Sequence, residues 1–142
     1  MEACYRQVKR DRDTNLLPLQ LDLVNPSPSI GFANDERPSI LQRGPADLVL
    51  ALGLVHHLAI SNNLPLAEIA DFLSRISDRL LIEFVPKEDS QVGRLLQNRE
   101  DVFPDYHQAG FETSFSKYFS IVKRQQINGT RRTLYLMRKK AA

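Results

Sequence analysis

The sequence predicts an α/β fold with a mostly parallel sheet, covered by helices on both faces and completed by an antiparallel C-terminal hairpin. First, segments with strand character alternate with segments of helical periodicity along the chain. Second, ADLVLALGL at 46–54 is a continuous apolar run, typical of a strand buried on both faces. Third, Asn128-Gly129 separates two strand-like runs near the end. Strands that alternate with helices are joined by right-handed crossovers, which make neighbouring strands parallel.

The size and composition of the chain indicate one domain over residues 1–142. Hydrophobic residues make up 42% and charged residues 25%, as in ordinary globular proteins. A net charge of +2 is too balanced to indicate nucleic acid as a partner. Cys4 is the single cysteine, which excludes an intrachain disulfide. The sequence shows no signal-peptide core and no apolar run of the roughly 20 residues that span a bilayer. We therefore expect a cytoplasmic protein that does not enter a membrane.

The first third of the chain is expected to contain two helices, one strand and one long loop. Residues 2–12 have helical character, and nothing breaks the helix before Asp13. LLPLQLDLV at 16–24 alternates apolar and polar residues near its end and predicts a strand that starts near Pro18 or lies at an edge. Residues 25–38 are rich in turn formers and predict a loop, which is followed by a short helix within 36–44.

The remaining chain is expected to continue the alternation and then form a hairpin. The expected strands are 46–54 and 79–86, and the expected helices are 64–76, 90–98 with Ser90 as its cap, and 107–117. The hairpin pairs 119–127 with 131–139 through a type I′ turn at Asn128-Gly129. In a parallel sheet, ligands lie at the carboxyl ends of the strands, so the loops after Leu23, Leu54 and Phe84 should share one edge.

Two adjacent histidines follow the apolar run. A zinc site needs three or four ligands, and neighbouring His56 and His57 cannot easily aim both rings at one ion. His107 is the one other histidine, so no metal site is predicted. A histidine at a strand's carboxyl end can serve as a catalytic base or can pack as part of the turn. We expect His57 to be the site residue and His56 to be structural. Glu83 is either a site residue at the ligand edge or an edge-facing side chain.

The segment ADLVLALGLVHHLA resembles the fourth-strand region of class I S-adenosylmethionine-dependent methyltransferases. In that family an acid leads an apolar strand, and a histidine follows a short apolar turn. Residues 64–76 and 79–86 resemble the next helix and the fifth strand, and the hairpin at 119–139 resembles the sixth and seventh strands. The resemblance implies a Rossmann-like three-layer sheet and S-adenosylmethionine as cofactor.

The resemblance also implies roles for particular residues. LPLQLDLVNPSP at 18–28 resembles the third strand, whose terminal acid contacts the adenine in many family members. It therefore implies that Asp22 and Leu23 bind the cofactor together with Gly53 and Leu54. It implies a catalytic role for His57, which would orient or deprotonate a methyl acceptor of unknown identity.

The sequence departs from the family at one essential place, because it lacks the first strand with its glycine-rich turn and the second strand. We therefore expect the carboxyl-terminal portion of a methyltransferase domain, produced by a truncated gene, a wrongly assigned start or excision. Cofactor binding by this chain alone should be weak or absent. The family places its first strand beside the fourth, so an apolar edge at 48–54 should be open. We expect either a homo-oligomer formed through this edge or a rearranged sheet with 18–24 beside 47–54.

Three functions are compatible with the sequence. The first is methyl transfer, inactive or weak in this chain. The second is a non-catalytic, methyltransferase-derived module for interaction or oligomerisation. The third is an unrelated small α/β binding domain such as a flavodoxin-like receiver, which the terminal hairpin opposes.

Overall fold

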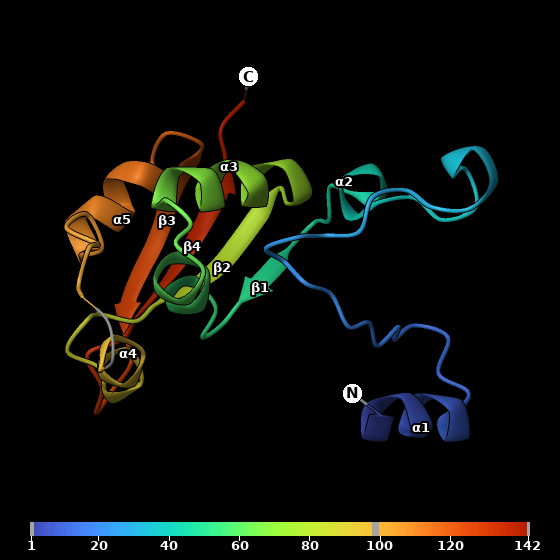
Figure 1. The fold of residues 1–142 in the computed structure, drawn as a ribbon, viewed down its shortest axis with the longest axis horizontal. Coiled ribbons are helices and arrows are strands. Elements are labelled where there is room, and N and C mark those ends of the chain that lie inside the picture. Colours follow the sequence, from blue (N-terminus) through green and yellow to red (C-terminus); the bar gives the residue numbers. More distant parts are fainter. Residues whose placement is uncertain (1, 98–99, 142) are drawn as a thin grey trace.

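The fold is built on a four-stranded mixed sheet. The computed structural model describes residues 2–97 and 100–141. The strands are β1 (Val49–Ala51), β2 (Arg79–Phe84), β3 (Phe119–Gln126) and β4 (Thr133–Lys139), in the spatial order β1-β2-β4-β3 (Figure 1). β1 and β2 are parallel, whereas β4 is antiparallel to both β2 and β3. The predicted α/β class is confirmed. The prediction of a mostly parallel sheet is wrong, because the hairpin supplies two of the four strands and residues 2–48 supply none.

Helices appear where the sequence predicts them. They are α1 (Glu2–Asp11), α2 (Ile40–Arg43), α3 (Leu66–Ile76), α4 (Ser90–Leu96) and α5 (Gln108–Phe115), with a 3₁₀ turn η1 (Phe32–Asn34) and a π-helical turn η2 (His57–Ser61). The end of the predicted helix 90–98 lies outside the described residues. α3 is amphipathic, and its buried residues recur at spacings of three and four. No helix among the described residues is long and apolar enough to cross a membrane.

Side chains cap the two helices that follow β2. Asp89, rather than the predicted Ser90, caps α4, and its Oδ1 accepts a hydrogen bond of 2.9 Å from the Gln91 amide. His107 caps α5, where its Nδ1 accepts a hydrogen bond of 3.1 Å from the Gly110 amide. Each cap satisfies an amide that the helix itself leaves without a partner.

The core lies between one face of the sheet and helices α3 and α5, which lie side by side in Figure 1. Phe111 of α5 is the centre of an aromatic cluster. Its ring centroid lies 5.1 Å from Phe84, 4.3 Å from Phe115 and 5.1 Å from Tyr135. All four side chains are buried, so β2 and β4 are joined to α5 by aromatic packing.

The opposite face of the sheet is more open. Leu50, Leu81 and Leu136 are neighbours in register across β1, β2 and β4. Leu50 is exposed, and the other two are half-buried. A third layer over this face is therefore not confirmed within residues 2–97 and 100–141.

The predicted strand at 16–24 does not form. These residues are irregular, and most of their apolar side chains are exposed. Pro18 removes one amide donor, and within the described residues the segment pairs with no strand, although the outer edge of β1 is unpaired. The predicted rearranged sheet is wrong for the same reason, since β1 pairs with β2 alone in the described part of the chain. β1 is an edge strand of three residues and not a central strand.

The C-terminal hairpin is confirmed, but its turn differs from the predicted type I′. The Thr130 amide donates to the Ile127 carbonyl at 3.1 Å, so Asn128 and Gly129 are the central residues. Gly129 has a φ of 74°, whereas Asn128 has no positive φ. A type I′ turn needs positive φ at both positions, but a type II turn needs it only at the second.

Candidate functional site

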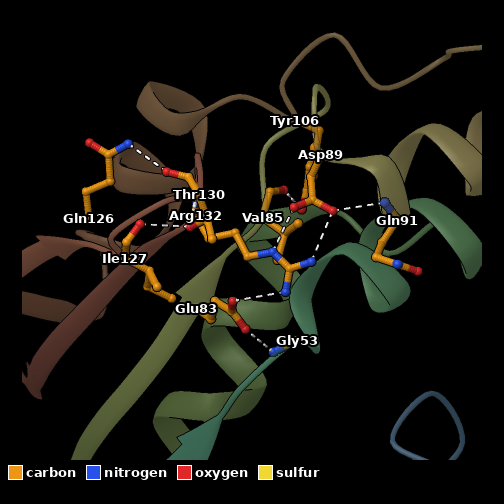
Figure 2. Close-up of polar contacts among 10 residues, drawn as sticks. All are labelled: Gly53, Glu83, Val85, Asp89, Gln91, Tyr106, Gln126, Ile127, Thr130 and Arg132. Carbon is orange, nitrogen blue, oxygen red and sulfur yellow. Dashed lines mark hydrogen bonds and ion pairs between the residues drawn. The ribbon is translucent and has the colours of Figure 1, made fainter.

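The carboxyl ends of β1 and β2 meet at a polar cluster. The chain leaves β1 through a turn at Gly53, whose φ of 60° is in the left-handed region that favours glycine. Glu83 lies near the end of β2 and is only 7% exposed. Figure 2 shows Glu83 between Gly53 on one side and Arg132, just before β4, on the other. The edge at which the sequence placed a ligand site is therefore occupied by charged side chains.

Both carboxylate oxygens of Glu83 have partners. Oε2 accepts a hydrogen bond of 2.7 Å from the Gly53 amide, and Oε1 lies 3.3 Å from Nη1 of Arg132. A buried carboxylate is costly unless it is paired and hydrogen-bonded, and these contacts meet that requirement. Glu83 lies at the carboxyl end of β2, where its carboxylate fixes the turn after β1.

Arg132 joins Glu83 to the loop after β2. Its Nε lies 2.7 Å from Oδ2 of Asp89 and its Nη2 lies 3.1 Å from Oδ1, a bidentate pair (Figure 2). These hydrogen bonds lower the pKa of Asp89 and raise the pKa of Arg132. A planar guanidinium that holds two carboxylates orients both. Glu83, Asp89 and Arg132 are hereafter called the Arg132 cluster.

Two further contacts hold the segment that follows β2. Tyr106 is buried, and its hydroxyl donates a hydrogen bond of 2.8 Å to the Val85 carbonyl. Burial raises the pKa of this phenol, so it remains a neutral donor. Lys87 Nζ contacts the Asp101 carboxylate at 2.7 Å and the Phe103 carbonyl at 2.7 Å. Val85 and Lys87, which lead from β2 to the Arg132 cluster, are thus tied to residues 101–106.

A cavity of about 600 Å³ opens beside the cluster. Most of its lining residues carry polar side chains, and they come from the end of β2, the start of α4 and the hairpin turn: Glu83, Glu88, Asp89, Ser90, Ile127, Gly129, Thr130, Arg131 and Arg132. Paired carboxylates and guanidinium groups of this kind can orient a polar ligand.

The two histidines after β1 have different surroundings. His57 is exposed and begins η2, whereas His56 is buried and only 3% exposed. Their rings lie 4.2 Å apart. No hydrogen-bond partner is found for His56 Nδ1 among the described residues. Burial, followed by the nearby His57 and Arg132, lowers the pKa of His56 and favours its neutral form.

The residues implied by the resemblance do not gather in one place. Gly53 and Leu54 lie at the end of β1, and the Leu54 carbonyl accepts a hydrogen bond of 3.0 Å from the His57 amide. Asp22 is exposed, and its Oδ1 accepts a hydrogen bond of 2.9 Å from the Val24 amide, as in an Asx turn. It lines a different cavity, of about 350 Å³, to which Gly53, Leu54 and His57 do not contribute. Leu23 is half-buried and packs against the core.

No metal site was found in the parts of the chain that the structure describes. These contain no group of three or more His, Cys, Asp or Glu side chains that could hold an ion.

The sequence did not reveal Asp89 and Arg132 as site residues. Asp89 directly precedes Ser90, which the sequence predicted as a cap, so the acid one residue earlier was the available signal. Arg132 carries no local signal, because it pairs with residues 43 and 49 positions away.

Comparison with known proteins gives one informative similarity. Nodulation protein NoeA of Rhizobium meliloti (strain 1021) is 47% identical over 121 residues. The alignment covers 85% of this chain but only 25% of NoeA, so the chain spans about a quarter of the length of that relative. No family model matches the chain. No solved structure matches it either.

Proposed function

We propose that the chain has the strand arrangement of a class I S-adenosylmethionine-dependent methyltransferase, with an acceptor still to be identified. The observation that carries this proposal is the strand order β1-β2-β4-β3, with β4 antiparallel between β2 and β3. In the family, the sixth and seventh strands form an antiparallel hairpin whose last strand is inserted beside the fifth. β1, β2, β3 and β4 then correspond to strands four, five, six and seven, and the proposal includes the family's Rossmann-like three-layer architecture.

The residues that the resemblance implies for the cofactor do not line one common cavity in this chain. The Gly53 amide already donates its hydrogen bond to Glu83. Asp22 lines a cavity to which Gly53 does not contribute. The sequence also lacks a glycine-rich turn. We therefore propose that S-adenosylmethionine binds this chain only weakly, and no methyl-transfer step follows from these residues. His57 remains the proposed contact for an acceptor, because it is exposed at the ligand edge.

Binding of S-adenosylhomocysteine, followed by amide chemical shifts, tests this proposal. NMR detects weak binding, so millimolar ligand should perturb the amides of Gly53, Leu54 and His57 even if calorimetry records no heat. Adenosine is the control that separates the nucleoside from the whole cofactor. The proposal of a cofactor edge is wrong if amides 53–57 do not respond.

A second function, self-association through β1, is favoured by a separate observation. β1 is an edge strand whose neighbouring leucines are exposed, and edges of this kind tend to pair with another chain. We propose a homo-oligomer that acts as an interaction module in the cytoplasm, without nucleic acid or membrane as a partner. Sedimentation velocity over a range of protein concentrations should show association, which Leu50→Lys should weaken.

The similarity to NoeA suggests a third experiment, which tests whether the two proteins act in the same biological process. We propose that this chain can replace the matching segment of NoeA. A NoeA chimera that carries this chain should retain the nodulation role of NoeA. A chimera that carries the Arg132→Ala form is the comparison and should retain less of that role.

A further inference from the structure

We propose that residues 17–21 of one copy of this chain pair with the free edge of β1 in a second copy, and that the exchange is reciprocal. This inference rests on the proposed self-association through β1. It adds the identity of the donor segment and the pairing that results.

The acceptor is the outer edge of β1. Within the described residues β1 pairs only with β2, so its other side is available for backbone hydrogen bonds. Leu48, Leu50 and Leu52 are 48%, 59% and 56% exposed. They alternate with half-buried Val49 and buried Ala51, so the three leucines lie on one face of the strand.

The donor is the segment that the sequence predicted as a strand. Leu17, Leu19 and Leu21 are 69%, 47% and 45% exposed and share the two-residue spacing of the acceptor leucines. Amides of successive residues in a strand point to opposite edges, and those of every second residue point to the same edge. If the amides of these leucines face β1, Pro18 faces away, where its missing amide proton costs nothing. The donor row of leucines then extends the acceptor row on the open face of the sheet.

A second copy is a better occupant of this edge than the chain's own segment. In one chain, Leu19, Leu21 and the residues that follow line a cavity together with Arg37, Ile40 and Arg43. The outer side of β1 has no pairing strand within residues 2–97 and 100–141. Each chain therefore carries one unpaired donor and one unpaired acceptor. Two copies can satisfy both pairs at once in an isologous dimer.

A complementation experiment tests this pairing. The donor variant is Leu19→Lys with Leu21→Lys, and the acceptor variant is Leu50→Lys with Leu52→Lys. Wild-type chain should dimerise in sedimentation velocity, and each variant alone should be monomeric. An equimolar mixture of the two variants should regain a dimer, because one wild-type donor meets one wild-type acceptor. Val122→Lys, an exposed position on the opposite edge strand β3, is the matched control and should dimerise like wild type.

The outcomes separate the donor assignment from self-association itself. If wild-type chain dimerises but the mixture does not, the chain associates and 17–21 is not the donor. If wild-type chain is monomeric at every concentration, both proposals are wrong. Circular dichroism and thermal melts verify that the variants fold.

If the lysine substitutions prevent folding, disulfide trapping tests the same pairing without them. In a Cys4→Ser background, which removes the free, exposed Cys4, Leu19→Cys and Leu50→Cys chains are oxidised alone and as a mixture. A disulfide dimer that forms mainly in the mixture supports the proposal. Equal crosslinking in every sample contradicts it.

Discussion

Residues 2–48 and residues 49–139 contain similar leucine-rich segments but differ in what those segments touch. Every fully buried residue of the described chain lies at or after Ala51, and α1 buries none. LLPLQLDLV in the first region and RLLIEF of β2 in the second are both apolar, yet only β2 has strands on both sides. An apolar pattern therefore becomes a strand only where a neighbour and a covering layer exist.

The largest expected effect is the loss of the central aromatic side chain. Phe111→Ala should lower the free energy of unfolding by about 3–5 kcal/mol, because it leaves a cavity among three aromatic rings. Urea denaturation followed by circular dichroism measures this change. A loss below about 1 kcal/mol would mean that the core does not depend on α5.

The next effect concerns the Arg132 cluster. Arg132→Met should lower the free energy of unfolding by about 2–3 kcal/mol, because Glu83 and Asp89 lose their cation. This is somewhat less than the loss on breaking a fully buried ion pair. Arg132 lowers the pKa of Asp89 below its usual 3.8. The stability that this pair contributes is therefore present above about pH 4 and is lost as the pH falls through the lowered pKa.

Acid titration of unfolding checks this second prediction. The wild-type chain should lose stability below pH 4 more steeply than Arg132→Met does, with Arg124→Met as the matched control for an exposed pair. Equal acid sensitivity in wild type and Arg132→Met would show that Asp89 does not depend on Arg132.

A smaller effect is expected at the turn after β1. Gly53→Ala should cost about 1–2 kcal/mol, because a left-handed φ disfavours any residue with a Cβ. The added Cβ would lie 3.8 Å from Glu83 Oε2, so crowding does not add to this cost. Gly93→Ala in α4 has open space and should be neutral or stabilising in the same denaturation assay.

His56 should produce a weaker, pH-dependent effect. Its pKa is lowered in the folded chain, so the unfolded chain binds more protons below its usual pKa of 6.5. Stability should therefore fall as the pH is lowered from about 7.5 to about 5.5, and His56→Phe should reduce that dependence. Thermal melts across this range measure it, and His57→Phe should weaken the dependence in part, because His57 contributes to the lowered pKa of His56.

The smallest effect is expected in the N-terminal region. Leu17→Ala should change the free energy of unfolding by less than about 0.5 kcal/mol at dilute concentration, because the side chain is exposed. The same substitution should matter more at concentrations at which the copies associate. A large effect in the dilute monomer would show that the two regions are folded together.

Local sequence patterns correctly predicted the helices and strands that bury one of their own faces against the core. α3 follows from apolar residues at spacings of three and four, and the hairpin follows from Asn128-Gly129 between two strand-like runs. The same reasoning failed at 16–24 and overestimated β1, because strand formation depends on neighbours that a local pattern does not specify. Glu83 was recognised as a candidate from its place in a strand. Arg132 was not, because its partners are distant in sequence.

The Arg132 cluster also has a consequence for the order of folding. Its contacts join residues separated by 30, 43 and 49 positions, whereas the hairpin and α3 are local. Closing such long loops costs chain entropy before any contact compensates for it. We therefore expect the hairpin and α3 to form early, and the Gly53 turn to be fixed only when β1, β2 and β4 have assembled. On this basis, the amide of Gly53 reports the last step, in which the turn after β1 is joined to β2.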